Sequence, residues 1–265
     1  MMRWIGIFSA LWLGLANTAS SQTVVRAGRG IPRVDSMCQR FQQLYVQIRE
    51  ESILVDSARK TFSDIMFGLR TKFRSAEPLR LDSTRRDSLL SRTAYFSFPL
   101  RGYGPDAIGG TRGSGYQAKG FDLFDYNVRG SHPAQDIFIT DRNQDCIDDQ
   151  TDRPVDVLSM TAGVVLAIET AWNAGQEYRG GNWIWIYDPI LDGLWYYAHN
   201  NAVTVRPGEW VQSGQKIAEV GRTGFNAFKT RSPTHLHIMY LQLQSDGLPL
   251  PQNTYDWLLA ADGQN

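Results

Sequence analysis

The sequence predicts a mainly β protein, in which an antiparallel β-sheet or sandwich domain follows an α-helical N-terminal extension. Apolar residues recur at helical spacing from residue 35 to about residue 73, whereas short β-like runs alternate with turn residues beyond Tyr95. With 265 residues and 42% hydrophobic content, the chain can bury a sizeable core. We expect a signal peptide at 1–21, the helical extension at 22–92 and the β domain at 93–265.

Two apolar stripes predict two helices in the extension. The stripes consist of Phe41, Leu44, Tyr45 and Ile48, and of Phe62, Ile65, Met66, Leu69 and Phe73. Asp35 or Ser36 is expected to cap the first helix. The extension contains no residue pattern that indicates chemistry.

Six runs after the glycine-dense loop 102–115 are expected to be strands. They are 162–168, 182–187, 194–198, 203–205, 216–220 and 235–243. Aromatic residues at 183, 185 and 187 alternate with isoleucines, so this strand is expected to bury both faces.

The first residues predict export to the periplasm or the medium. Arg3 precedes an apolar run, Trp4 to Ala16, and small and polar residues follow at 17–21, which is typical of a secretory signal peptide. An uncleaved anchor is the alternative, but a membrane span needs about 20 apolar residues. We therefore expect no stable membrane span after cleavage.

The charge balance argues against a nucleic-acid partner, and the cysteine content allows at most one intramolecular disulfide. Lys+Arg and Asp+Glu each total 27, so the net charge predicts no nucleic-acid partner. Cys38 and Cys146 are the only cysteines. In an oxidising compartment they form either one disulfide or two separate thiols, and the sequence leaves both open.

The four histidines stand in contexts that suit a metal site. His132 and Asp136 are spaced i, i+4, and His235 and His237 are spaced i, i+2 in a strand-like run, so each pair shares one face. Two imidazoles and a carboxylate are a common catalytic zinc set, with water in the fourth position. A single histidine is more often a packed or surface residue, but His132, His199, His235 and His237 together favour the metal site.

Three segments resemble the signature of the lysostaphin-type peptidoglycan metalloendopeptidases. They are His132 to Asp136 (HPAQD), Tyr197 to His199 (YAH) and His235 to His237 (HLH), with the glycine-rich stretch 205–224 between the last two. The resemblance covers about 95–243, and the expected helices lie outside it.

The resemblance implies a zinc metalloendopeptidase with one zinc ion per chain. Carried over position by position, it makes His132, Asp136 and His237 the zinc ligands. It makes His199 and His235 catalytic residues beside the attacking water and the scissile carbonyl, and which of them is the general base stays open. The implied substrate is a stem peptide or cross-link of peptidoglycan, and the bond that is cleaved stays open.

The sequence departs from the family pattern without removing an implied ligand. Ala134 replaces a usual glycine, Asn200 a usual leucine and Thr234 a common proline. Segments 137–156 and 225–233 are longer than usual. These insertions are expected to change the groove, and thus the substrate, more than the activity.

An acidic segment within the first insertion is a candidate calcium loop. From Asp141 to Asp152, oxygen-bearing side chains occupy loop positions 1, 3, 5, 9 and 12, as in known calcium loops. Cys146, however, stands where such loops need glycine. A solvated acidic loop is the alternative.

Two other functions are weighed against the peptidase. The run 211–220 resembles the hairpins of lipoyl and biotinyl carriers, with Lys216 as attachment site, but a carrier leaves the histidines unexplained. Family members that have lost zinc ligands activate cell-wall amidases, whereas this chain retains all the implied ligands.

Overall fold

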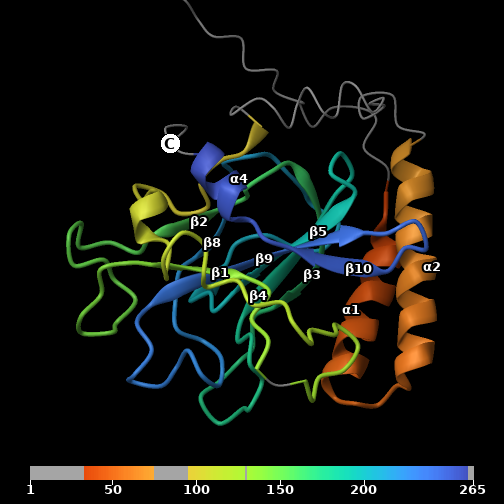
Figure 1. Cartoon of the computed structure of the whole chain (residues 1–265), viewed down its shortest axis with the longest axis horizontal. Helices are drawn as coiled ribbons and strands as arrows, with labels where there is room; N and C mark the ends of the chain where they lie inside the picture. Colours follow the sequence, from red (N-terminus) through yellow and green to blue (C-terminus); the bar gives the residue numbers. More distant parts are fainter. Residues whose placement is uncertain (1–32, 75–94, 129, 262–265) are drawn as a thin grey trace, which may run out of the picture.

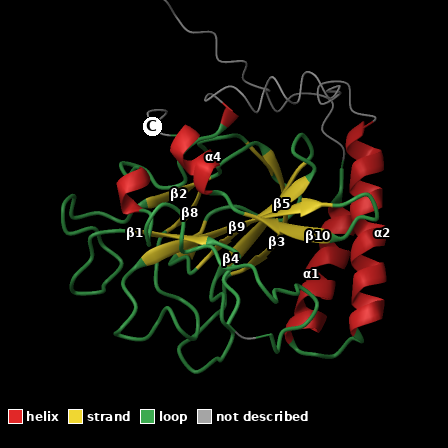
Figure 2. Ribbon diagram, viewed as in Figure 1, coloured by secondary structure: helices red, strands yellow, loops and turns green. Residues whose placement is uncertain are grey.

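The computed structural model describes residues 33–74, 95–128 and 130–261, so the expected signal peptide 1–21 lies outside the described residues. Figures 1 and 2 show two long helices beside a β-sheet, with a smaller sheet and a short helix on its other side. The helices are α1 (Asp35–Arg49), α2 (Val55–Arg74) and α4 (Tyr255–Ala260), with a short 3-10 turn at Pro105–Ala107. The strands are β1 (Gln135–Phe138), β2 (Asp156–Leu158), β3 (Gly163–Glu169), β4 (Trp183–Asp188), β5 (Gly193–Ala198), β6 (Ala202–Val203), β7 (Trp210–Val211), β8 (Lys216–Glu219), β9 (His235–Leu243) and β10 (Pro249–Gln252).

Both sheets are antiparallel throughout. The large sheet has the order β1-β9-β5-β4-β3-β7, and β10 pairs with β9 beyond the end of β1. The small sheet has the order β2-β8-β6. The mainly β fold with N-terminal helices is therefore confirmed.

The large sheet buries both of its faces. In β4, Trp183, Trp185 and Tyr187 belong to one hydrophobic cluster, while Ile184 and Ile186 belong to the other. All six residues of β4 are buried, as the alternation of the sequence predicted. The first cluster contains the buried stripes of α1 and α2, and the second contains the small sheet and Leu258 of α4.

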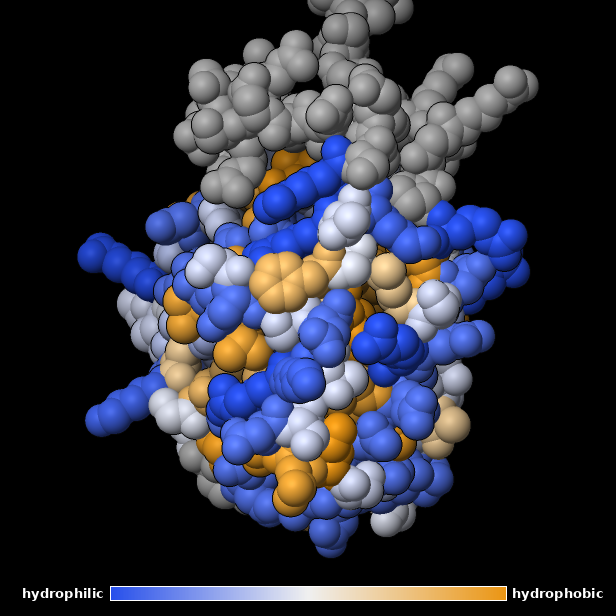
Figure 3. Space-filling model, turned by 90° about the vertical axis from the view of Figure 1, so that its right-hand side faces the viewer, coloured by the Kyte–Doolittle hydropathy of each residue, from blue (hydrophilic) through white to orange (hydrophobic). Residues whose placement is uncertain are grey.

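The two long helices are packed onto the sheet through aromatic side chains. Phe41 of α1 meets the Trp185 ring edge-on, with 6.0 Å between ring centroids. Phe73 of α2 lies against Tyr187 of β4, with 5.7 Å between ring centroids. Figure 3 shows the helix side of the molecule as a largely hydrophilic surface with separate hydrophobic patches. Exposed apolar residues of this part of the chain include Leu54, directly before α2, and Phe67 of α2.

The sequence located the elements well but not all of their ends. Both apolar stripes are buried as expected, except that Tyr45 is partly exposed. The expected cap of α1 is wrong: its N-cap is Val34 without a side-chain hydrogen bond, and the Asp35 carboxylate instead accepts a 2.8 Å bond from Arg33. Strands β1, β2, β7 and β10 were not expected; they have two to four residues each, too few for a visible period.

The two cysteines are separate thiols. Cys38 is buried beneath β3, where its thiol donates to the Val165 carbonyl at 3.5 Å, and burial raises its pKa to about 11. Cys146 lies partly buried in the acidic loop. Among the described helices, none is long and apolar enough to cross a membrane.

Because the helices complete the first cluster, truncating one buried side chain of α2 should destabilise the whole molecule. Phe62 is 1% exposed, and Phe62→Ala is expected to lower the free energy of unfolding by about 3–5 kcal/mol. Lys60→Ala, at an exposed position of the same helix, should change it by less than about 0.5 kcal/mol. Urea unfolding measures both, and equal small effects would mean that α2 does not stabilise the β domain.

Candidate metal centre and its groove

Strand pairing brings the predicted ligands together. β9 lies between β1 and β5, and its register places His237 opposite Asp136 on one side and opposite Ala198 on the other. His235 is two residues earlier on β9, and His199 directly follows β5. His132 precedes β1, where its backbone exchanges two 2.7 Å hydrogen bonds with Gln117. The three sequence motifs therefore meet at one edge of the sheet.

Three side-chain atoms form a nearly equilateral triangle. His132 Nε2 lies 3.2 Å from His237 Nδ1 and 3.2 Å from Asp136 Oδ1, and His237 Nδ1 lies 3.1 Å from Asp136 Oδ1. His235 Nε2 is farther away, at 3.9 Å from Asp136 Oδ1. Within the described residues, His132, Asp136 and His237 are the one cluster of His, Cys, Asp and Glu that could hold a metal ion.

Backbone carbonyls orient three of the four imidazole rings. Nδ1 of His132, His199 and His235 lies 2.8 Å from the carbonyl oxygens of Gly115, Thr223 and Pro233, respectively. A carbonyl only accepts, so each Nδ1 carries the proton and donates it. In the neutral ring, each Nε2 then keeps its lone pair.

The charges of the site follow from burial and from Asp136. Burial alone would raise the pKa of Asp136, but hydrogen bonds from His132 and His237 hold it far below its usual range. Burial, together with the neighbouring His235 and His237, lowers the pKa of His199 well below its ordinary value. At neutral pH the site therefore contains an ionised carboxylate and a neutral His199.

The pKa values of the other two ligand candidates, His132 and His237, are shifted in opposite directions. Burial lowers the pKa of His237 despite its contact with Asp136. For His132 the hydrogen bond to Asp136 outweighs burial, so its pKa is raised. The difference matches their exposure, since the side chain of His132 is 34% exposed and that of His237 is 17% exposed.

The metal-site residues line a groove of about 650 Å³ that reaches helix α1. His235, His237 and Met239 project from the same face of β9, and Met239 belongs to the cluster that the helices cover. At its other end the groove is lined by Tyr45 and Arg49 of α1. The extension thus supplies one wall of the groove, which its sequence did not indicate.

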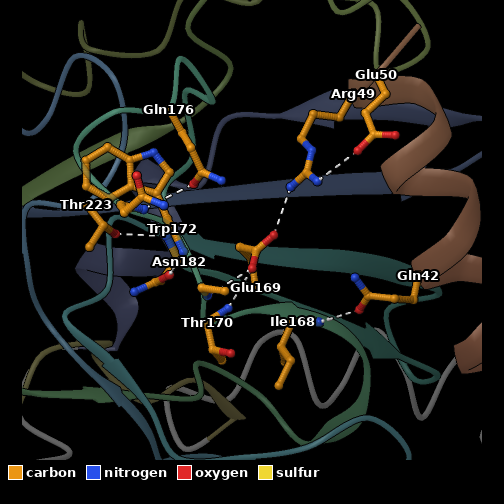
Figure 4. A network of polar contacts seen from close by, with 12 residues as sticks. Gln42, Arg49, Glu50, Ile168, Glu169, Thr170, Trp172, Gln176, Asn182 and Thr223 are labelled. Atoms are coloured by element: carbon orange, nitrogen blue, oxygen red, sulfur yellow. Dashed lines mark hydrogen bonds and ion pairs between the residues drawn. The ribbon is translucent and has the colours of Figure 1, made fainter. Parts of the chain in front are cut away.

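Polar contacts tie this wall to the sheet. The Arg49 guanidinium pairs with Glu169 at 2.8 Å and lies 3.9 Å from the centroid of the Tyr178 ring. Figure 4 shows Arg49 reaching from α1 to Glu169, whose other oxygen accepts from the backbone of Thr170. Gln42 accepts from the backbone of Ile168 at 3.0 Å.

Carboxylates of the acidic loop accept hydrogen bonds from backbone N–H groups of the same loop. The buried Asp141 accepts hydrogen bonds from the backbone of Asp145 and Cys146 and from the Thr234 hydroxyl at 2.6 Å. Asp148 accepts from a neighbouring backbone N–H in the same way. These contacts use carboxylate oxygens of the loop, and within the described residues the loop does not form a cluster that could hold a metal ion, so calcium has no support. They also join the loop to Thr234, the residue before His235.

The two insertions contact each other. The Gln144 side chain donates to the carbonyls of Thr230 at 2.9 Å and of Ser232 at 3.4 Å. The two longer segments are therefore hydrogen-bonded to each other, and Asp141 joins them to Thr234 next to His235.

Residues 142–248 match the family model described as Peptidase family M23. This part of the chain is therefore similar to peptidase family M23. The match contains His199, His235 and His237, while His132 and Asp136 lie just before it in the chain. Pairing of β1 with β9 places Asp136 opposite His237 of the matched segment, and His132 Nε2 lies 3.2 Å from the same histidine.

Solved structures show similar but distant relatives. Lysostaphin from Staphylococcus simulans has 22% identity over 60% of this chain, with a TM-score of 0.38, and the chain spans about half (52%) of its length. A zinc containing peptidase from Vibrio cholerae has 22% identity over 59% of this chain and 39% of its own, with a TM-score of 0.38. A candidate glycyl-glycine endopeptidase lytM from Ruminococcus gnavus ATCC 29149 has 20% identity over 88% of this chain and 89% of its own, with a TM-score of 0.45.

Removing the Asp141 carboxylate should destabilise the loop rather than abolish an ion site. Asp141→Ala leaves two backbone N–H groups and the Thr234 hydroxyl without their acceptor, so we expect a loss of about 1–3 kcal/mol in the free energy of unfolding. Asp64→Ala on the exposed face of α2 is the matched control. Thermal unfolding with and without millimolar calcium should give the same transition for the wild type. A calcium-dependent shift that Asp141→Ala removes would contradict this account.

Proposed function

We propose that this protein is an exported zinc metalloendopeptidase that hydrolyses peptide bonds in stem peptides or cross-links of peptidoglycan. The observation that carries the proposal is the triangle of His132, Asp136 and His237 in the lining of a groove of about 650 Å³. The match of residues 142–248 to a peptidase family supports it. In this proposal, 1–21 is the signal peptide and 93–265 the metallopeptidase domain, with 22–92 as its helical extension.

The donor set suits zinc. Ligands at about 2.0–2.1 Å from a tetrahedral ion lie about 3.3 Å from one another, close to the 3.1–3.2 Å edges of the triangle. The Gly115 carbonyl holds the Nδ1 proton of His132, so its Nε2 lone pair faces the ligand position. Zinc bound there would polarise a peptide carbonyl. It would also lower the pKa of water so that the water can lose a proton near neutral pH and attack.

His199 and His235 supply the proton chemistry in this proposal. Their rings lie 4.8 Å apart, and both line the groove beside the triangle. With Nδ1 donating to a carbonyl, each neutral ring offers Nε2 as a proton acceptor. One ring takes the proton of the water that attacks the carbonyl carbon, and the resulting imidazolium gives this proton to the leaving amine as the C–N bond breaks. The other ring, when it holds a proton on Nε2, donates a hydrogen bond to the oxygen that gains charge.

The carrier alternative fits the site poorly. Its attachment residue would be Lys216, whose ammonium group pairs with Asp156 at 2.8 Å and with Glu219 at 2.7 Å. These pairs raise the pKa of Lys216 and leave it a poor nucleophile. The amidase-activator alternative is disfavoured because all three candidate ligands are present and adjacent.

The ligand proposal predicts about one zinc ion per chain. His132→Ala and His237→Ala each remove one corner of the triangle and should abolish stoichiometric zinc, because two protein ligands bind zinc much more weakly than three. His235→Ala, which removes a ring outside the triangle, should retain it. Elemental analysis of purified protein measures the ratio, and full occupancy in both ligand variants would disprove the assignment.

The catalytic proposal predicts zinc-loaded but slow variants. His199→Ala and His235→Ala should each lower kcat by about 10²–10⁴-fold while zinc content and thermal stability stay near wild type. The double variant should lose less than the product of the single losses, because both rings act on one transition state. Release of peptides from purified peptidoglycan, followed by mass spectrometry, measures the rate and identifies the bond. Wild-type rates in both zinc-loaded single variants would exclude the mechanism.

A further inference from the structure

His199 occupies an unusual backbone position at the end of β5. Its φ is 68°, a left-handed conformation that residues with a side chain seldom adopt. Its backbone N–H donates to the Gly180 carbonyl at 3.0 Å, and the next residue, Asn200, donates to the Asn182 carbonyl at 3.0 Å. The conformation of His199 is therefore maintained by the segment that enters β4.

Thr223 connects the parts of this arrangement. Its hydroxyl accepts from the Asn182 backbone N–H at 2.8 Å and donates to the Asn200 carbonyl at 2.9 Å. Its own carbonyl accepts the Nδ1 proton of His199 at 2.8 Å. One residue thus bridges the segments before β4 and after β5, and also sets the tautomer of His199.

The packing around Thr223 leaves little room for adjustment. A Cβ atom on Gly181 would lie 2.2 Å from the Thr223 backbone, and one on Gly224 would lie 3.0 Å from Nδ1 of His199. Both glycines also have positive φ values, 62° and 110°. The backbone around the imidazole is therefore closely packed on two sides.

The segment before β4 is itself anchored. Asn182 accepts a 3.1 Å hydrogen bond from the backbone of Trp172. Figure 4 shows Thr223, Asn182 and Trp172 on one side of this network, and Arg49 of α1, which pairs with Glu169 of β3, on the other. The hydroxyl of Thr223 therefore contacts a segment that is itself held in place by hydrogen bonds.

We infer that Thr223 is a positioning residue for His199: its hydroxyl holds the Asn182 and Asn200 segments together so that its carbonyl can orient the imidazole. The inference rests on the proposed function only for its effect on rate. Valine keeps the shape of threonine but lacks the hydroxyl, so Thr223→Val removes both hydrogen bonds and leaves the volume nearly unchanged. The His199 ring is then expected to lose its fixed orientation.

The first test is a spectroscopic one that needs no activity. In wild-type protein labelled with ¹⁵N in its histidines, with and without zinc, His199 is expected to show the Nδ1–H tautomer and a slowly exchanging imidazole proton. The signal is assigned by its loss in His199→Ala. Thr223→Val should speed its exchange by about 10-fold. A wild-type His199 without a protonated Nδ1 overturns the inference, even if Thr223→Val proves unstable.

The second test separates positioning from stability. In the zinc-loaded enzyme, Thr223→Val should lower kcat by about 10–100-fold with little change in KM or zinc content. Thr223→Ser, which restores the hydroxyl, should recover most of that loss. The matched control is Thr254→Val, at a threonine 1% exposed whose hydroxyl makes no hydrogen bond within the described residues, and it should retain wild-type kcat.

The outcomes distinguish this inference from the proposed function. An inactive wild type that still shows the slow His199 proton would refute the peptidase and leave the positioning role intact. Wild-type kcat and unchanged proton exchange in Thr223→Val would refute the positioning role and leave the peptidase intact. Equal losses in the valine and serine variants would assign the effect to packing and also refute it.

Discussion

The antiparallel pairing of β9 with β1 and β5 is the constraint on which the site depends. It aligns Asp136, His237 and Ala198 across three strands, so two candidate ligands become cross-strand neighbours and His199 emerges beside them. A shift of one residue in the register would turn the β9 histidines to the opposite face. The apolar residues of β9 prevent this slip, because its two faces are buried in different clusters. The geometry of the metal centre therefore follows from the packing of the sheet core.

The same burial explains why helices from outside the M23 match reach the groove. All of β4 is buried, so the sheet needs cover on both faces. Helices α1 and α2 cover the face from which His235 and His237 project, and the groove continues from the histidines to Tyr45 and Arg49. The family match spans 142–248 and includes neither residue. The helices thus stabilise the sheet and also complete the wall beside its reactive edge.

Sequence reasoning succeeded where function needs particular side chains. Two apolar stripes at helical spacing predicted α1 and α2, and short β-like runs predicted β3, β4, β5 and β9 of the large sheet. The histidine motifs and the family resemblance pointed to the residues that meet, since only a few side chains can bind zinc. The sequence did not predict the contacts that backbone atoms make with the histidines. The carbonyl groups of Gly115, Thr223 and Pro233 orient three histidines, and any residue can provide a carbonyl. The wall formed by α1 was also missed, because helical periodicity shows which residues are buried and not which surface they cover.

The proposed division of the histidines into zinc ligands and catalytic residues rests on ring orientation together with distance. His132, His199 and His235 share one tautomer, so the tautomer alone cannot assign their roles. His132 Nε2 lies 3.2 Å from Asp136, whereas His235 Nε2 lies at 3.9 Å, outside the triangle but near enough to act on what is bound there. His237 enters the triangle through Nδ1. Because His199 and His235 lie outside the triangle, their Nε2 lone pairs stay free in the proposed arrangement. A zinc ion held by the triangle would then retain an open position for water and substrate.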